Sequence, residues 1–382
     1  MLFINCDKYD KLWHTVSNMT KSLIEKIKHF YDAHERETGI AFMIFGFVVD
    51  NLTLKRSDLL FDNLVIVWYL LVALICITVI NMNGSGRIRQ PSLQKISYWT
   101  PVPMQIAFGG LFSAFTVLYS RSAAIFASWP FITILFLLMV GNEFAKSRYA
   151  KFTFQLTVFY TALLSYSILL MPVITKRMGD FIFIISGIAS LLIIILVILL
   201  LKKLALDRIL KSQRPIVVSI ALVFATFNIL YFTNIIPPVP LSLRAIGAYH
   251  DLQSKNYAYD AFVEPPAWYQ FYNETSQTFH RYNNERIYIF SSVFAPTNLA
   301  NQVYHRWLKY NETSKKWVEQ NLFSYPMVGG RDGGFRGFSY KQNIEPGLWR
   351  VDVVTKRKQL IGRFTFTVEE SLAEPEVKAV KL

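Results

Sequence analysis

Long apolar runs dominate the part of the chain before residue 240. They lie at roughly 39–54, 61–82, 102–120, 122–142, 152–174, 178–201 and 215–236. A helix needs about 20 apolar residues to cross the hydrocarbon core of a bilayer, and most of these runs reach or approach that length. The first is the weakest, because it is short and carries Asp50 and Asn51 near its end. The pattern predicts an all-α membrane domain of about seven transmembrane helices at residues 39–240.

The segment before the first run has a different period. Its apolar residues recur at three- and four-residue steps, namely Leu12, Val16, Met19, Leu23, Ile27 and Phe30. Such spacing is typical of an amphipathic helix. We interpret residues 1–38 as a cytoplasmic amphipathic segment that covers the inner ends of the bundle. The alternative is a helix that lies on the membrane surface or packs on a partner.

A domain boundary follows the last apolar run. Pro237, Pro238 and Pro240 end the helix, because proline lacks the backbone N–H and clashes with the preceding turn. Beyond them the sequence becomes polar and rich in aromatic residues. We expect residues 241–285 to form an aromatic-rich connector and residues 371–382 to form a flexible tail.

Short β-type runs alternate with turn residues between that connector and the tail. They lie at 286–294, 303–310, 316–323, 337–341, 348–355 and 359–368. Trp349 and Val351 alternate with Arg350 and Asp352, which is the period of two expected of a half-buried strand. Six such runs without intervening helices predict a small all-β domain at residues 286–370, an immunoglobulin-like antiparallel sandwich.

The positive charges indicate how the chain is oriented. Its formal net charge is +14, but Lys and Arg lie mostly in short segments between apolar runs, where they mark the cytoplasmic face rather than a nucleic-acid site. The basic segments are 8–36, 87–95, 146–151 and 202–214. The alternate segments hold only Lys55, Arg56, Arg121, Lys176 and Arg177. This bias predicts a cytoplasmic N-terminus, an outer C-terminal domain, the lipid bilayer as a partner, and no nucleic acid.

The sequence offers little for catalysis of the soluble type. The 2 cysteines, Cys6 and Cys76, precede the β-type region, so we expect no disulfide framework there. The 6 histidines form no metal-spaced pair, and Cys-x-x-Cys, His-Glu-x-x-His and Gly-x-Ser-x-Gly do not occur. We therefore predict neither a metal site nor a cofactor, and we favour a protein that is not an enzyme.

The β-type region also carries a family pattern. Its elements are Ala295-Pro296, residues 303–307 (VYHRW), 328–331 (VGGR), 334–339 (GFRGFS), 346–351 (PGLWRV) and 362–366 (GRFTF). In order and spacing they resemble the bacterial domain-of-unknown-function family 2914 (DUF2914). The resemblance implies a bacterial inner-membrane protein with a periplasmic domain, and it transfers no catalytic residue. One departure is Lys356-Arg357-Lys358, in a turn where the family tends to hold Asp-Gly.

Several residues of the outer domain are candidates for ligand binding. Arg331 and Arg336 flank a glycine-rich stretch and suit an anionic group; the alternative is that they pair with Asp332, Asp352 or carbonyl oxygens. The stretch lacks the Gly-Lys-Ser/Thr ending of a phosphate loop, so we interpret it as a turn or bulge. Aromatic candidates for stacking on a sugar or for a protein contact are Trp268, Tyr269, Tyr272, Phe335 and Phe338. Trp307 and Trp349 are expected in the core.

Three carboxylates form a candidate group in the membrane domain. Asp50, Asp58 and Asp62 are predicted near the outer ends of the first two helices, where together they suit a cation or a cationic headgroup. Pairing with Lys55 and Arg56, together with helix capping, is the favoured interpretation.

Three functions follow from this inventory. The leading hypothesis is an envelope protein that presents the sandwich to a periplasmic protein partner or a cell-wall glycan. The second is a transporter or channel that uses the outer carboxylates. The third is a lipid-modifying membrane enzyme.

Overall fold

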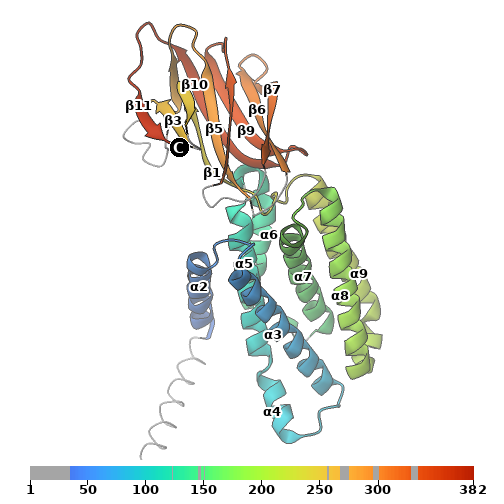
Figure 1. The fold of residues 1–382 in the computed structure, drawn as a ribbon. Helices are drawn as coiled ribbons and strands as arrows, with labels where there is room; N and C mark the ends of the chain where they lie inside the picture. Colours follow the sequence, from blue (N-terminus) through green and yellow to red (C-terminus); the bar gives the residue numbers. More distant parts are fainter. Residues whose placement is uncertain are drawn as a thin grey trace, which may run out of the picture.

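The chain folds into a helical bundle that carries a β domain on one end (Figure 1). The computed structural model describes residues 35–122, 124–144, 148–149, 151–255, 258–266, 275–295, 301–327 and 334–382. Residues 1–34, which hold most of the predicted amphipathic segment, lie outside the described residues.

Each of the predicted membrane helices corresponds to one helix of the bundle. The described helices are α2 (Glu35–Thr53), α3 (Leu60–Gly84), α4 (Pro91–Trp99), α5 (Pro101–Arg121), α6 (Ile125–Phe144), α7 (Phe152–Thr175), α8 (Asp180–Leu204) and α9 (Leu206–Phe232). The short α4 is additional, and both α4 and α5 start on a proline, whose missing N–H needs no partner at that position. Helix α9 begins earlier than predicted and continues through Pro215, because its first turns pack into the bundle through Ile209, which is buried.

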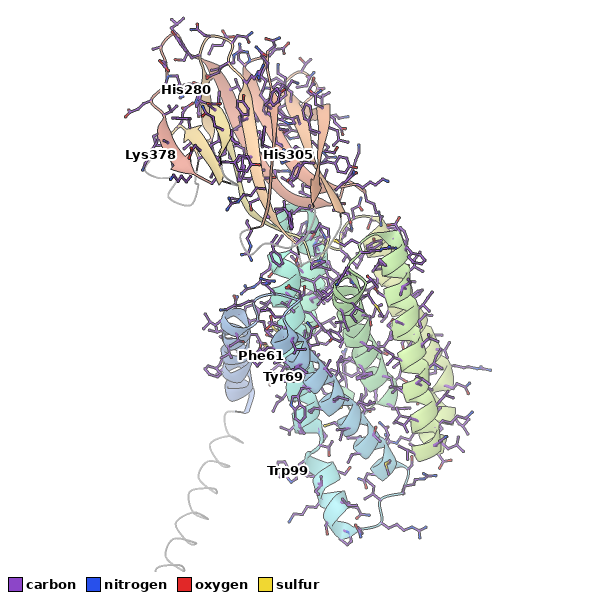
Figure 2. All side chains as sticks on the ribbon, in the orientation of Figure 1. Phe61, Tyr69, Trp99, His280, His305 and Lys378 are labelled. Carbon is purple, nitrogen blue, oxygen red and sulfur yellow. The ribbon has the colours of Figure 1, made fainter. Side chains whose placement is uncertain are left out.

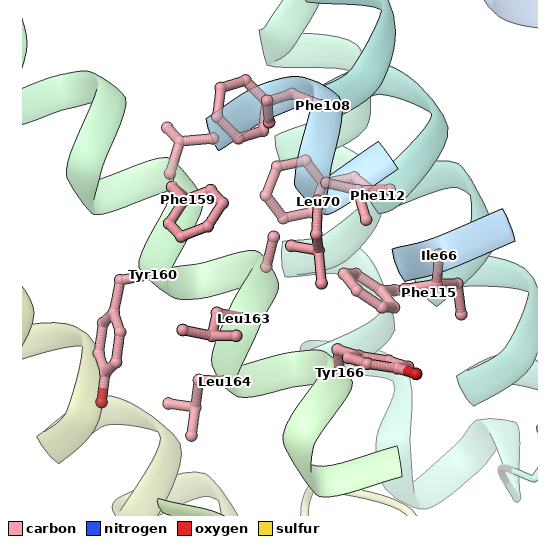
Figure 3. Packing of buried hydrophobic residues seen from close by; sticks show 14 of the residues in the cluster. Ile66, Leu70, Phe108, Phe112, Phe115, Phe159, Tyr160, Leu163, Leu164 and Tyr166 are labelled. Atoms are coloured by element: carbon pink, nitrogen blue, oxygen red, sulfur yellow. The ribbon is translucent and has the colours of Figure 1, made fainter. Parts of the chain in front are cut away.

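Helices α5 and α7 form the centre of the bundle. Of the apolar window in each span, 67% is buried for α4–α5 and 72% for α7, against 33% for α8 and 22% for α9. Figure 3 shows Phe112 and Phe115 of α5 packed beside Ile66 and Leu70 of α3, with Leu163 of α7 facing them. Within the described residues, six helices are long and apolar enough to cross a membrane, and the apolar part of α2 is the shorter Met43–Thr53.

The outer surface of the bundle is apolar as well. On α8 the side chains of Leu192, Ile195, Leu196 and Leu199 are each at least 50% exposed, and α3, α6 and α9 also expose large apolar side chains. Soluble monomers rarely expose an apolar surface that extends over several neighbouring helices. Water is therefore a poor solvent for this part of the molecule.

The β domain contains eleven strands within the described residues. They are β1 (Ser242–Tyr249), β2 (Asp251–Lys255), β3 (Ala258–Val263), β4 (Thr278–Arg281), β5 (Ile287–Phe294), β6 (Asn301–Asn311), β7 (Lys316–Met327), β8 (Phe335–Lys341), β9 (Gly347–Thr355), β10 (Leu360–Glu370) and β11 (Lys378–Lys381). Three sheets result, with the orders β1-β5-β8, β4-β10-β9-β6-β7 and β11-β3-β2.

The six predicted strands correspond to β5 to β10, but the boundaries of the β domain differ from the prediction. Strands β1 to β4 occupy the segment that we expected to be a connector, and β11 lies in the expected flexible tail. Their partners are far away in sequence: β1 pairs with β5 and β11 with β3. The domain is also not wholly antiparallel, because β4 runs parallel to β10.

Two sheets enclose the main core of the β domain. Trp307, Trp349 and Phe366 of the five-stranded sheet pack with Ile289 of the three-stranded sheet β1-β5-β8, and all four are buried. The predicted core positions of Trp307 and Trp349 are confirmed. The third sheet packs on the outer face of β1 and β5 through a small separate cluster. In it Ala261 of β3 lies with Tyr249 of β1 and Phe290 of β5.

Candidate functional site

A row of aromatic side chains lies on the outer face of the sheet β1-β5-β8. Tyr288 of β5 pairs directly with Tyr340 of β8, and Phe338 lies two positions before Tyr340 on the same face. The ring centroids are 5.6 Å apart for Tyr288–Tyr340, 6.2 Å for Tyr288–Phe338 and 6.0 Å for Tyr259–Phe338. We call Tyr259, Tyr288, Phe338 and Tyr340 the aromatic shelf.

The shelf changes from buried to exposed across the sheet. Phe290, directly opposite Phe338, is only 2% exposed beneath the third sheet, whereas Phe338 is 38% and Tyr340 48% exposed. Arg286 lies over the Tyr340 ring, with its guanidinium carbon 5.1 Å from the ring centroid. The arrangement can receive a flat, partly apolar ligand and offer it a cation at one end.

Two glycines near the start of β8 meet different structural requirements, one through its backbone conformation and one through the closeness of a neighbouring ring. Gly334 has a φ of +84°, which other residues rarely adopt. A Cβ on Gly337 would lie 2.4 Å from the ring of Tyr325. Strand β8 follows instead of a helix, so these residues form no phosphate loop.

The predicted ligand residues have different positions. Phe338 lies on the aromatic shelf, whereas Phe335 packs inward against an inner cluster that contains Val293 and Val353. Arg336 donates to the carbonyl oxygen of Leu382 at 2.9 Å and does not pair with Asp352. Arg331, Trp268, Tyr269 and Tyr272 lie outside the described residues.

Asp352 has three arginine partners that the sequence did not indicate. On the outer face of the five-stranded sheet it is fully buried between Arg306 at 2.7 Å, Arg363 at 2.7 Å and Arg350 at 3.3 Å. The register explains the contacts, because Arg306 of β6 and Arg363 of β10 both lie directly opposite Asp352 of β9. The three cations cover one buried anion and leave this face positively charged.

A second charged cluster joins strands β1 and β4 to the loop after β3. His250 lies 2.9 Å from Glu264 and 3.0 Å from Glu285, and Glu264 also contacts His280 at 2.6 Å. Burial opposes the charged form of His250, but the two carboxylates outweigh it and raise the pKa of His250 to about 9. Burial likewise opposes the charge on Glu264, yet its contacts with the two histidines lower the pKa of Glu264.

The three membrane-domain carboxylates do not converge on one site. Asp58 forms a two-point ion pair with Arg56, with N–O distances of 2.9 and 2.6 Å. Asp62 accepts the backbone N–H groups of Lys55 and Arg56, each at 2.9 Å. Asp50 accepts the hydroxyl of Ser113 on α5 at 2.5 Å. Each carboxylate therefore already has a local partner.

Polar side chains do connect the helices at a different level of the bundle. Asn81 of α3 donates to Gln155 of α7 at 2.7 Å, and Gln155 donates to the carbonyl oxygen of Tyr149 at 2.6 Å. The Tyr149 hydroxyl donates to Asn142 of α6, which donates to the carbonyl oxygen of Gln105 on α5 at 2.9 Å.

The turn between β9 and β10 attaches the β domain to the bundle. The Arg357 guanidinium pairs with Asp180 at the start of α8 and lies over the ring of Tyr231, 4.5 Å from its centroid. Asn234 donates to the carbonyl oxygen of Arg357 at 3.3 Å. A cavity of about 470 Å³ lies at this junction. The basic turn that departs from the family pattern is thus the docking element.

Comparison with known proteins supports the family resemblance for the C-terminal part. Residues 300–368 match the model of a family described as "Protein of unknown function (DUF2914)", a stretch that runs from β6 to β10. No curated protein matches the chain. Among solved structures, the Pseudomonas fluorescens alkylpurine DNA glycosylase AlkC bound to DNA containing an abasic site analog aligns at 10% identity over 82% of this chain and 100% of that chain, with a TM-score of 0.23. No inference about fold or function follows from a likeness at that level.

Proposed function

We propose that this chain is an integral protein of a bacterial inner membrane that presents its β domain on the periplasmic side, where the aromatic shelf binds a cell-wall glycan. The exposed pair Phe338 and Tyr340, beside Arg286, carries the ligand part of the proposal. The apolar outer surface of the bundle and the uneven distribution of Lys and Arg support the membrane part.

A glycan suits the shelf for chemical reasons. The C–H faces of sugar rings are apolar and flat enough to stack on aromatic rings, while hydroxyl and carboxylate groups at the ring edges can accept hydrogen bonds from an arginine. Tyr288 and Tyr340 add phenolic hydroxyls at the edges of the shelf. Aromatic anchors of this kind carry much of the binding energy at an interface.

Binding of the full-length protein to purified peptidoglycan sacculi tests the proposal. Replacing both Phe338 and Tyr340 by Ala removes the exposed rings and should weaken binding roughly 5- to 30-fold, or about 1–2 kcal/mol in total. Val318→Ala with Leu322→Ala is a matched control, because these β7 side chains are 42% and 44% exposed but lie outside the shelf. Equal binding by both double variants would remove the shelf as the site.

The structure gives less support to transport through the outer carboxylates. A cation site requires several oxygens that point at a common centre, whereas Asp50, Asp58 and Asp62 point to three separate partners. If transport occurred there, replacing all three by Asn would abolish uptake or conductance.

A further inference from the structure

A basic recess lies at the junction between the bundle and the β domain, apart from the aromatic shelf. It has a volume of about 120 Å³ and is lined by Lys55, Arg56, Arg121 and Arg244. These cations come from the α2–α3 loop, the end of α5 and strand β1, so only the tertiary structure brings them together. Three of them are among the few basic residues of the outer segments, where the positive-inside rule disfavours such charges.

The charge of the recess is only partly compensated. Asp58 neutralises Arg56 through two hydrogen bonds. Among the described residues, Lys55, Arg121 and Arg244 have no carboxylate within ion-pair distance. Arg121 donates to the carbonyl oxygen of Asn51 at 2.6 Å, which orients its guanidinium without cancelling its charge. Asp62 also lies beside the recess, because it accepts the backbone N–H groups of Lys55 and Arg56. The four cations and these two carboxylates therefore leave about two net positive charges.

The walls of the recess strengthen its attraction for an anion. Leu118 and Phe294 are nearly fully buried beside the cations. Because these side chains are apolar and exclude water, they screen the positive charges only weakly. The Arg56 and Arg244 guanidinium groups both lie over the Phe294 ring, at 4.5 and 5.4 Å from its centroid. Ser57, Ser122 and Ser242 place hydroxyl groups in the same lining. Cationic and hydroxyl groups around a small space supply the hydrogen-bond donors that the oxygen atoms of a phosphate group accept.

We propose that this recess binds a phosphate group, supplied either by the headgroup of a membrane lipid or by a free phosphorylated compound. The recess lies where α2 and α5 end and α3 begins, which is the level of lipid headgroups if these helices cross a bilayer. The lipid source rests on the proposed membrane insertion, whereas the phosphate site itself does not. Neither depends on the aromatic shelf.

The test uses the full-length protein with two probes. Both probes are titrated against the same protein in an uncharged maltoside detergent: inorganic phosphate, and phosphatidic acid dispersed in that detergent, with diacylglycerol as the control lipid that lacks the phosphate group. Lys55→Gln with Arg244→Gln removes two cations whose side chains make no hydrogen bond to a described residue. Each lost charge-assisted contact should weaken binding roughly tenfold. Lys55→Arg with Arg244→Lys keeps the charges and should restore binding.

Lys176→Gln with Arg177→Gln is the matched control, since these basic residues lie exposed in the turn between α7 and α8 and outside the recess. It should change binding less than threefold. Binding of inorganic phosphate alone identifies a free compound as the source, and binding of phosphatidic acid alone identifies a lipid. The proposal is wrong if wild type binds neither probe or if both double variants weaken binding equally, because general surface charge would then explain it. Loss of peptidoglycan binding by the shelf variant, with phosphate binding intact, separates the two proposals.

Discussion

At the scale of single residues, two histidines of the β domain, one partly buried and one fully buried, have opposite charge states because their partners differ. His250 lies between the carboxylates of Glu264 and Glu285 and is charged at neutral pH. The ring nitrogens of His305 lie 2.7 and 2.9 Å from the hydroxyls of Ser291 and Ser339 and face no carboxylate among the described residues, and burial lowers the pKa of His305 to about 3. Figure 2 shows His305 among the central strands and His280, the neighbour of Glu264, at the end of the domain remote from the helices.

The raised pKa of His250 links the stability of the β domain to pH. The folded-state pKa of about 9 lies above the ordinary value of 6.5, so its stabilisation is complete below pH 6.5 and is lost as the pH rises toward 9. Glu264 acts in the opposite direction: its lowered pKa gives a contribution that is present above its ordinary value of 4.5 and is lost in acid.

We predict that the unfolding free energy of the β domain falls by about 2 kcal/mol as the pH rises from 6.5 to 9. His250→Gln should remove most of this dependence, because the side chain no longer binds a proton. Denaturant unfolding of the wild type and of the variant, each as the full-length protein and followed by tryptophan fluorescence at several pH values, measures the pH dependence of the unfolding free energy in each. The same slope in wild type and variant would contradict the assignment.

At the scale of elements, the β9–β10 turn couples the two parts of the molecule. Arg357 contacts the bundle through Asp180 and Tyr231, whereas the next residue, Lys358, pairs with Glu319 of β7 within the β domain. Neighbouring basic residues of one turn thus have different tasks. Gln359 adds a hydrogen bond to the carbonyl oxygen of Ile236 in the proline-rich linker, at 3.5 Å.

We predict that Arg357→Gln loosens this junction without unfolding either part. The lost ion pair is partly exposed, so together with the ring contact it should contribute about 1–2 kcal/mol, or roughly a 5- to 30-fold change in the undocked population. The rate of limited proteolysis in the linker at residues 233–241 measures that population. Lys358→Gln is the control and should leave the rate unchanged; an equal increase in both variants would argue against docking by Arg357.

At the scale of the whole molecule, the bundle and the β domain have surfaces of different character. The bundle exposes leucine and isoleucine on α8 and α9, while the β domain mostly encloses its apolar side chains. Exposed apolar helices are stable in lipid because their backbone groups are satisfied within each helix. The two parts therefore fit a protein that is half embedded and half in water.

The proposed orientation is tested by reporter fusions. We predict a cytoplasmic signal from a fusion after Ala205, between α8 and α9, and a periplasmic signal from a fusion after Leu372, which is fully exposed beyond β10. Alkaline phosphatase and a fluorescent protein that matures only in the cytoplasm give opposite readouts. Signals on the same side at both positions would refute a membrane crossing by α9.

Local patterns in the sequence determined the apolar helices and the six strands from β5 to β10. The apolar and polar residues of these elements recur with a period that does not depend on any partner. The last helix ends at Phe232, and Pro237 and Pro238 prevent it from resuming in the linker. Of the candidate ligand residues, Phe338 was found in this way, because its neighbours indicated a strand next to a glycine turn.

Only the tertiary structure decided what those elements bring together. Strands β1 and β11 depend on partners elsewhere in the chain, and pairing energy from distant segments leaves no period in the local sequence. The same holds for the aromatic shelf, for the cations around Asp352 and for the basic recess of Lys55 and Arg244. The sequence states which chemical group each side chain carries. Which groups become neighbours is decided by strand register and helix packing, which are properties of the whole fold.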